Sequence, residues 1–239
     1  MGPGTQPNAT GRRRYAEYFD AVEINSTFYR LPRIATLERW RDATPDDFRF
    51  AIKLPKAVTH EAGLIGVAAE VAEFCALIAH LRQKLGPLLL QLPPSLELNA
   101  RAASRFLRQL ATAAPAPVVV EPRHPSWFTA RADDLLSEHG AGRVAADPAL
   151  SEAAAEPGGS RSVSYFRWHG SPRMYFSAYE ADAIRSLALR AAEHRRSGSD
   201  VYCIFDNTAL GAAAVNAFAL QAALTRSVRE RRPRADLSR

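Results

Sequence analysis

The sequence has few cysteines, few lysines and no long apolar run. Its two cysteines, Cys75 and Cys203, lie far apart in apolar segments, which excludes a disulfide framework and a CxxC-type zinc site and favours a reducing compartment. No run of 18 or more apolar residues occurs, and the first seven residues lack the basic, apolar and small-residue order of a secretory signal. We therefore expect a cytoplasmic protein with no membrane partner.

The basic residues are unevenly distributed along the chain. Only Lys53, Lys56 and Lys84 are lysines among 31 basic residues, and the net charge of +6 first suggests a nucleic-acid partner. However, residues 12–14 carry +3 and residues 226–239 carry +4, so the rest of the chain sums to −1. We predict flexible basic segments at 1–14 and 225–239, which could attract nucleic acid without specificity, around a nearly neutral domain at 15–224.

The apolar pattern predicts strands that alternate with helices. Short apolar runs predict strands at 19–25, 48–53, 87–91, 117–121, 143–146, 163–168 and 201–206. Three- and four-residue spacing predicts helices at 36–41, 67–85, 99–110, 133–138, 181–195 and 212–224, and the small polar stretch 151–162 is interpreted as a loop. No low-complexity linker divides the chain, so we expect one α/β domain with parallel strands.

Polar residues at the strand ends favour a barrel over an open sheet. Nearly every predicted strand begins apolar and ends in a charged or amide residue, and a barrel gathers these ends around one mouth. Alternation then directs Glu23, Lys53 and Glu121 into the lumen, and Trp168 toward the helices as a core residue. The predicted fold is a TIM-type (β/α) barrel, although seven strands are recognisable where a standard barrel has eight.

Six segments in order resemble the YecE-like family, which is also classified as domain of unknown function 72. They are Val22–Tyr29, Phe48–Lys53 with Val58–His60, Lys84–Pro87 with Gln91–Pro94, Glu121–Trp127, Arg167–Gly170 and Phe205–Thr208. The resemblance covers residues 14–224 and implies a TIM-type barrel with no established activity. Members usually open with a Gly-Thr-Ser-Gly-Trp-like first strand. That opening is absent here, which predicts exposed edges at 19–25 and 201–206.

The candidate site is the set of polar residues at the predicted mouth. It comprises Glu23, Asn25, Lys53, His60, Gln91, Glu121, Arg123, His124, Asp147, Arg167, His169, Asp206 and Asn207, with Trp127 nearby. One interpretation is purely structural, because buried charges must be paired and a salt-bridged lumen would satisfy them. The alternative is function, since catalytic groups of such barrels collect at this face.

Hydrolysis of a phosphate ester is the first functional hypothesis. Arg123 and Arg167 could bind phosphate oxygens, His124 or His169 could act as general acid or base, and Glu121 could orient a water molecule or a histidine. A metal-dependent version would use ligands from Glu23, Glu121, Asp147, His169 and Asp206, although no HxH or HExxH pair supports it. The substrate would be phosphorylated or derived from nucleic acid.

Two further hypotheses remain open. A desolvated Lys53 could form a Schiff base with a carbonyl compound, as in barrel aldolases, unless Lys53 pairs with Glu23 or Glu121. Alternatively, the protein binds nucleic acid or a phosphorylated ligand without chemistry. In that case Trp127 would present a stacking surface beside Arg123, unless its ring packs over the barrel rim.

Overall fold

The computed structural model describes residues 15–114 and 116–230; the predicted segment 1–14 and the end of the predicted tail, 231–239, lie outside the described residues. The strands are β1 (Ala21–Ile24), β2 (Arg49–Lys53), β3 (Leu85–Gln91), β4 (Val118–Glu121), β5 (Ala141–Arg143), β6 (Ala145–Asp147), β7 (Gly158–Gly159), β8 (Val163–Trp168) and β9 (Asp200–Phe205). The α-helices are α2 (Ile34–Asp42), α3 (Ala68–Ile78), α4 (Ala100–Ala113), α5 (Ala130–Glu138), α6 (Glu152–Ala155), α7 (Ala181–Arg196) and α8 (Ala212–Glu230). Among the described residues, no helix is long and apolar enough to cross a membrane.

The strands form two sheets that are dominated by parallel pairing. One sheet has the order β1-β2-β3-β4-β5-β7 and the other the order β6-β8-β9, and β7 is antiparallel to β5. The chain passes from β5 to β6 through a single residue, Val144. The fold is therefore the mixed α/β type predicted from the sequence, with alternating strands and helices.

The sheets do not close into a complete ring. β1 and β9 are outer strands of different sheets, and both line a cavity of about 800 Å³ that reaches the amino-terminal turn of α8. Each of these strands has one hydrogen-bonded neighbour among the described strands, so its other edge is unpaired there. These are the two strands whose edges the sequence predicted to be exposed.

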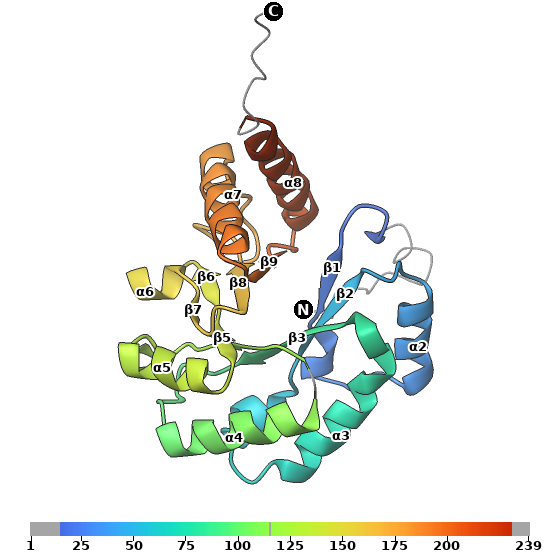
Figure 1. Ribbon diagram of the computed structural model, residues 1–239, viewed down its shortest axis with the longest axis vertical. Helices are drawn as coiled ribbons and strands as arrows, with labels where there is room; N and C mark the ends of the chain where they lie inside the picture. The colour runs from blue at the N-terminus through green and yellow to red at the C-terminus, as the bar shows by residue number, and fades with distance from the viewer. Residues whose placement is uncertain (1–14, 115, 231–239) are drawn as a thin grey trace, which may run out of the picture.

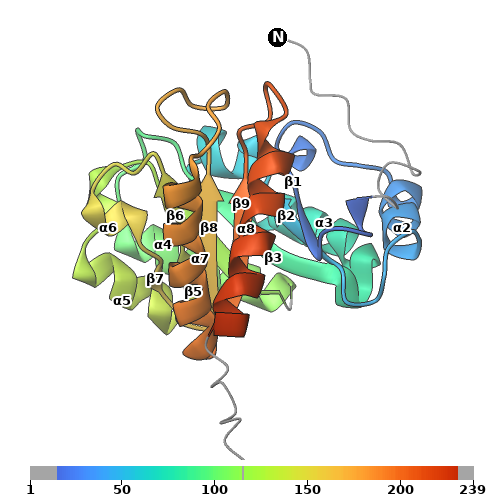
Figure 2. The same ribbon diagram turned by 90° about the horizontal axis from the view of Figure 1, so that it is seen from above.

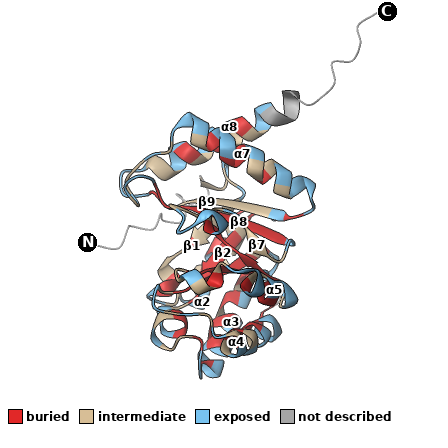
Figure 3. Cartoon of the chain, turned by 90° about the vertical axis from the view of Figure 1, so that its left-hand side faces the viewer, coloured by how far each residue is buried: buried red, intermediate tan, exposed pale blue. Residues whose placement is uncertain are grey.

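Helices cover the outside of the curved sheets on opposite sides. In Figure 1, α3 and α4 lie on one side of the strands, and α7 and α8 lie on the other. Figure 2 shows α7 and α8 side by side in front of β8 and β9. The burial colouring of Figure 3 places most buried residues between these helices and the strands, as expected for helices that bury one face.

Side-chain alternation separates an outer core from an inner one. The outer clusters contain Phe50 and Ile52 of β2 and, near α7, Trp168 of β8. The inner cluster contains Ala51 of β2 and Tyr165 of β8, both fully buried. The prediction that Trp168 is a core residue that faces the helices is thus confirmed, and the inner face is left for the polar residues at the strand ends.

Three local predictions were wrong. The predicted strand 143–146 is divided at Val144 between β5 and β6, which belong to different sheets. The stretch 151–162 contains α6 and β7 rather than only a loop, because Gly158 and Gly159 pair with β5 in a space that a side chain would not fit. The predicted helix 67–85 ends earlier, since α3 gives way to a 3₁₀ segment at Ala79–Lys84, where Arg82 has a positive φ of 53°. None of these changes moves a residue of the predicted site.

Candidate functional site

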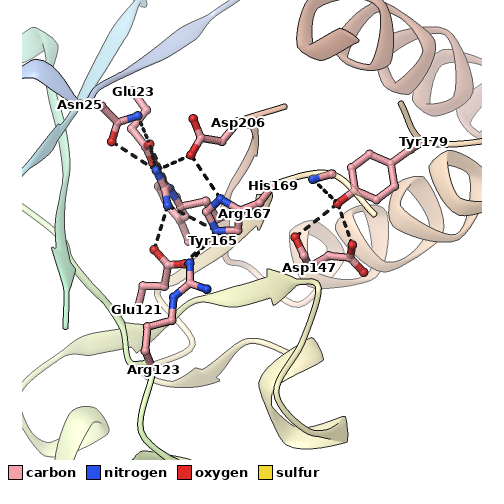
Figure 4. Close-up of polar contacts among 11 residues, drawn as sticks. Glu23, Asn25, Glu121, Arg123, Asp147, Tyr165, Arg167, His169, Tyr179 and Asp206 are labelled. Carbon is pink, nitrogen blue, oxygen red and sulfur yellow. Dashed lines mark hydrogen bonds and ion pairs between the residues drawn. The ribbon is translucent and has the colours of Figure 1, made fainter. Parts of the chain in front are cut away.

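Eight polar residues from four strand ends form one hydrogen-bonded cluster, which we call the buried network (Figure 4). It consists of Glu23, Asn25, Glu121, Arg123, Tyr165, Arg167, His169 and Asp206. Tyr165 lies in the middle of β8, and the other side chains come from the carboxyl ends of β1, β4, β8 and β9 or from the one or two residues that follow. Because parallel strands end on the same side of a sheet, residues far apart in the sequence meet here.

Arg167 lies at the centre of the buried network, and its side chain is 2% exposed. Its Nε donates to both oxygens of Glu23 at 3.0 Å, and its Nη1 donates to Oε2 of Glu121 at 3.0 Å. Its Nη2 donates to Asp206 Oδ2 at 3.0 Å and to Asn25 Oδ1 at 3.2 Å. One cation therefore holds three carboxylates together, as the fork of donors on a guanidinium allows.

Glu121 is fully buried and accepts from three groups. Besides Arg167, these are Arg123, whose Nη2 lies 2.5 Å from Oε1, and His169, whose Nε2 lies 2.9 Å from the same oxygen. His169 Nδ1 lies 3.2 Å from Asp206 Oδ2. Both ring nitrogens of His169 therefore face carboxylates, and neither is free to act as an acid or base toward a ligand.

Burial and neighbouring charges shift the pKa values of the buried network in opposite directions. Burial would raise the pKa of Glu121, but the Arg167 charge and the His169 hydrogen bond lower it well below its usual range. The pKa of Asp206 is lowered for the same reasons. Burial would lower the pKa of His169, but its hydrogen bonds to Asp206 and Glu121 raise it overall. The folded state therefore favours the ionised carboxylates and the protonated imidazole more than the unfolded chain does.

The raised pKa of His169 predicts a loss of stability at alkaline pH. We expect its contribution to be complete below the unfolded-state pKa of about 6.5 and to disappear as the pH rises through the higher folded-state pKa. The His169→Gln variant should lack this decline, as measured by urea unfolding at several pH values. Because His60 and the other histidines are common to both proteins, the difference isolates His169. Parallel pH profiles of the two proteins above pH 6.5 would contradict this prediction.

Lys53 ends β2 next to the buried network without belonging to it. Its side chain is largely buried, its Nζ lies 4.2 Å from the centre of the Phe28 ring, and it has no hydrogen bond or ion pair within the described part of the chain. The pairing with Glu23 or Glu121 that the sequence left open is therefore not formed, because Arg167 occupies both carboxylates. Burial and the Arg167 charge lower the pKa of Lys53 to about 8.

Two predicted site residues hold loops instead of joining the buried network. Asp147 accepts a hydrogen bond from the Tyr179 hydroxyl at 2.7 Å, to one side of the network in Figure 4. Asn207 is buried and donates to the Ser177 carbonyl and to Asn216 Oδ1, both at 2.9 Å. Both side chains are used to attach the loops that follow β6 and β9.

Two others stabilise the chain after β4. His124 Nδ1 lies 2.9 Å from Ser126 Oγ, and its Nε2 lies 3.8 Å from Glu97. Trp127 is 2% exposed, and its Nε1 donates to the Leu96 carbonyl at 3.0 Å. Trp127 therefore cannot serve as a stacking surface, and the alternative that it packs against the domain is confirmed.

The last two predicted residues are His60, which lies near Lys53, and Gln91, which lies at the end of β3. His60 Nδ1 lies 2.8 Å from Thr59 Oγ1, and its ring meets the Phe28 ring edge-on with 4.9 Å between centres. Gln91 is half-buried at the end of β3, in register with Glu121 of β4. The Phe28 ring thus contacts both the His60 ring and the Lys53 ammonium. Gln91 ends β3, the strand that lies between β2 and β4.

One member of the buried network was not among the predicted site residues, although strand alternation places it on the inner face of β8. Tyr165 is fully buried and donates its hydroxyl to Glu23 Oε2 at 2.7 Å. The signal was present, because Tyr165 precedes Arg167 by two residues and so shares its face of β8. An aromatic residue in a strand is also typical of a core, so the sequence did not distinguish the two roles.

The five residues proposed as metal ligands do not form a metal centre. Arg167 lies between Glu23, Glu121 and Asp206, and Asp147 is bonded to Tyr179. In the part of the chain that the structure describes, no three His, Cys, Asp or Glu side chains are arranged to hold a metal ion. The geometry therefore supports a charge network organised by arginine.

The fold and site define an α/β protein with mostly parallel strands and a buried charged network at their carboxyl ends. A family model described as "Protein of unknown function DUF72" matches residues 2–237, so the chain belongs to the DUF72 family. The chain is 34% identical over 144 residues to the UPF0759 protein YecE of Escherichia coli K12, which covers 58% of this chain and 52% of that protein. It is 26% identical over 121 residues to the UPF0759 protein YunF of Bacillus subtilis, and this match covers 48% of this chain and 43% of that protein.

The chain spans about half the length of the curated relatives it matches. Solved structures agree over more of the chain. A DUF72 family protein from Enterococcus faecalis superposes with a TM-score of 0.77 at 21% identity and covers 91% of this chain and 94% of that one. A second DUF72 family protein, from Thermotoga maritima, gives a TM-score of 0.72 at 26% identity. This match covers 91% of this chain and 90% of that one. These superpositions support the fold.

Proposed function

We propose that the strand-end mouth of this protein, which we interpret as an incomplete TIM-type (β/α) barrel, binds a phosphorylated small molecule or a ligand derived from nucleic acid. The observation that carries the proposal is a largely buried cation without an ion pair. Arg123 and Arg167 pair with Glu23, Glu121 and Asp206, and Lys53 adds a cation with no ion pair among the described residues. An anionic ligand would balance that charge.

Arg123 supplies the second feature that supports an anionic ligand. Its Nη2 donates to Glu121 Oε1, but its buried Nε has no hydrogen-bond partner within the described residues. Buried donors are nearly always satisfied, so an unsatisfied donor on a largely buried guanidinium is a natural place for a phosphate oxygen. The arrangement gives hydrolysis less support than binding, because both nitrogens of His169 already face carboxylates.

The proposal predicts that binding depends on the phosphate and on Arg123. Calorimetry should detect binding of glycerol 3-phosphate but not of glycerol, and Arg123→Gln should weaken it about 10- to 100-fold, as expected for a charged hydrogen bond. Arg105→Gln is the matched control, since Arg105 is exposed on α4. Circular dichroism would show that each variant is folded. Equal affinity of wild type and Arg123→Gln, or no preference for the phosphorylated compound, would contradict the proposal.

A further inference from the structure

The three lysines of this chain have very different surroundings. Lys84 is buried and saturated, because its Nζ donates to the carbonyls of Arg41 and Thr44 at 2.6 and 2.5 Å. Lys56 has an exposed side chain and an ion pair with Glu61 at 3.2 Å. Lys53 alone combines burial with an Nζ that has no ion pair or hydrogen bond in the described part of the chain. Its amine is therefore the one of the three that is both sheltered and chemically available.

The position of Lys53 explains why its amine stays unpaired. The carboxylates of Glu23, Glu121 and Asp206, at other strand ends, attract the Lys53 charge electrostatically. All three are bound by Arg167 at 2.9 to 3.0 Å. The face of the Phe28 ring lies against Nζ, which shields the amine without accepting a proton. A desolvated lysine next to another cation is the arrangement that activates an amine as a nucleophile.

We infer that Lys53 forms an imine with the carbonyl carbon of a phosphorylated aldehyde or ketone bound at the mouth. This inference rests on the proposed function, which supplies the phosphate, and adds the substrate class and the reacting residue. The three carboxylates of the buried network favour the imine. Its protonated form keeps a positive charge on the Lys53 nitrogen, and these carboxylates already stabilise a positive charge there. Asp206 is the most exposed of them, at 19%, so it is the carboxylate with most access to solvent.

The proposed step balances without an additional reactant. The lone pair of the neutral Lys53 amine forms the carbon–nitrogen bond, and the carbonyl electron pair moves to oxygen, which takes up a proton. The nitrogen of the resulting carbinolamine loses a proton, and the hydroxyl group leaves as water after protonation. The product is the protonated imine, and no atom is oxidised or reduced.

The acidity of Lys53 makes this step feasible near neutral pH. With a pKa of about 8, about 9% of the Lys53 amine is neutral at pH 7. An ordinary lysine, with a pKa of about 10.4, has about 0.04% in that form, so the difference is about 200-fold. Labelling of Lys53 by an aldehyde should therefore level off above pH 8.

Reductive trapping tests the inference on the full chain. The protein is incubated with pyridoxal 5′-phosphate at pH 7.5, treated with sodium borohydride and mapped by mass spectrometry of its peptides. We expect a single main site at Lys53, and at least tenfold less labelling of Lys56, Lys84 and the Met1 α-amino group. Lys53→Arg should abolish this labelling, and the matched Lys56→Arg variant should retain it.

The same experiment separates failure of the inference from failure of the proposed function. Pyridoxal, which lacks the phosphate, should label Lys53 at least tenfold more slowly than pyridoxal 5′-phosphate. Equal labelling by the two aldehydes would overturn both the phosphorylated substrate class and the proposed function. Labelling confined to Met1 or Lys56, in a protein that still binds glycerol 3-phosphate, would overturn the imine and leave the proposed function intact.

Discussion

Replacing Arg167 with methionine is expected to lower the free energy of unfolding by about 3–5 kcal/mol, which is the usual cost of breaking a buried ion pair by removing one partner. Methionine keeps much of the volume but supplies no charge. Glu23 and Glu121, which are 2% and 0% exposed, would then lie close together with their main cation removed. Urea unfolding at pH 7, followed by circular dichroism, measures the change.

The control for this prediction is Arg105→Met on α4. Arg105 is exposed, so its replacement should change the free energy of unfolding by less than about 0.5 kcal/mol. The Arg167→Met variant should also regain stability at low pH relative to wild type, because protonation neutralises the carboxylates it leaves unpaired. A loss below about 1 kcal/mol at pH 7 would show that Arg167 does not hold the site together.

Glu121→Gln is expected to produce the second large effect, a loss of about 3 kcal/mol at pH 7. The amide preserves the shape of the side chain, so the change tests charge more than packing. Arg123 would lose its ion pair at 2.5 Å, and His169 would lose a carboxylate at 2.9 Å. Arg167 would retain Glu23 and Asp206, which is why we expect a smaller effect than for Arg167→Met.

The pH dependence of Glu121→Gln distinguishes lost charge from disturbed packing. The pKa of Glu121 is lowered in the folded state, so its contribution is present above the unfolded-state value of about 4.3 and is lost as the pH falls. The stability difference between wild type and variant should therefore shrink from pH 7 to pH 3. Glu73→Gln, at an exposed position of α3, should show a small difference at every pH. A constant large difference for Glu121→Gln would indicate that packing dominates.

Strand periodicity was sufficient to predict most of the buried network. The alternation of β8 placed Arg167 and His169 on the face opposite Phe166 and Trp168, and the structure has the latter pair against the helices. This succeeds because the direction of a strand side chain depends only on its position along the strand. The common side of the strand ends follows in turn from parallel pairing.

Strand periodicity could not predict which partner each side chain contacts. Asp147 follows the pattern of the other strand ends, yet it bonds Tyr179, and Trp127 beside Arg123 turns into the core. Loops decide these outcomes, because the loop after a strand has no period that fixes the direction of its side chains. The short strand β7 was missed for a related reason, since two glycines give no apolar pattern.

The sequence by itself determined that the strands alternate with helices, that their polar ends share one side, and that the chain has few lysines and cysteines. Only the tertiary structure decided which of the gathered charges pair. Glu23 and Tyr165 are 142 residues apart, and their contact at 2.7 Å depends on how the sheets curve. That curvature brings three carboxylates onto Arg167, and because one guanidinium binds them all, Lys53 is left with an unpaired amine.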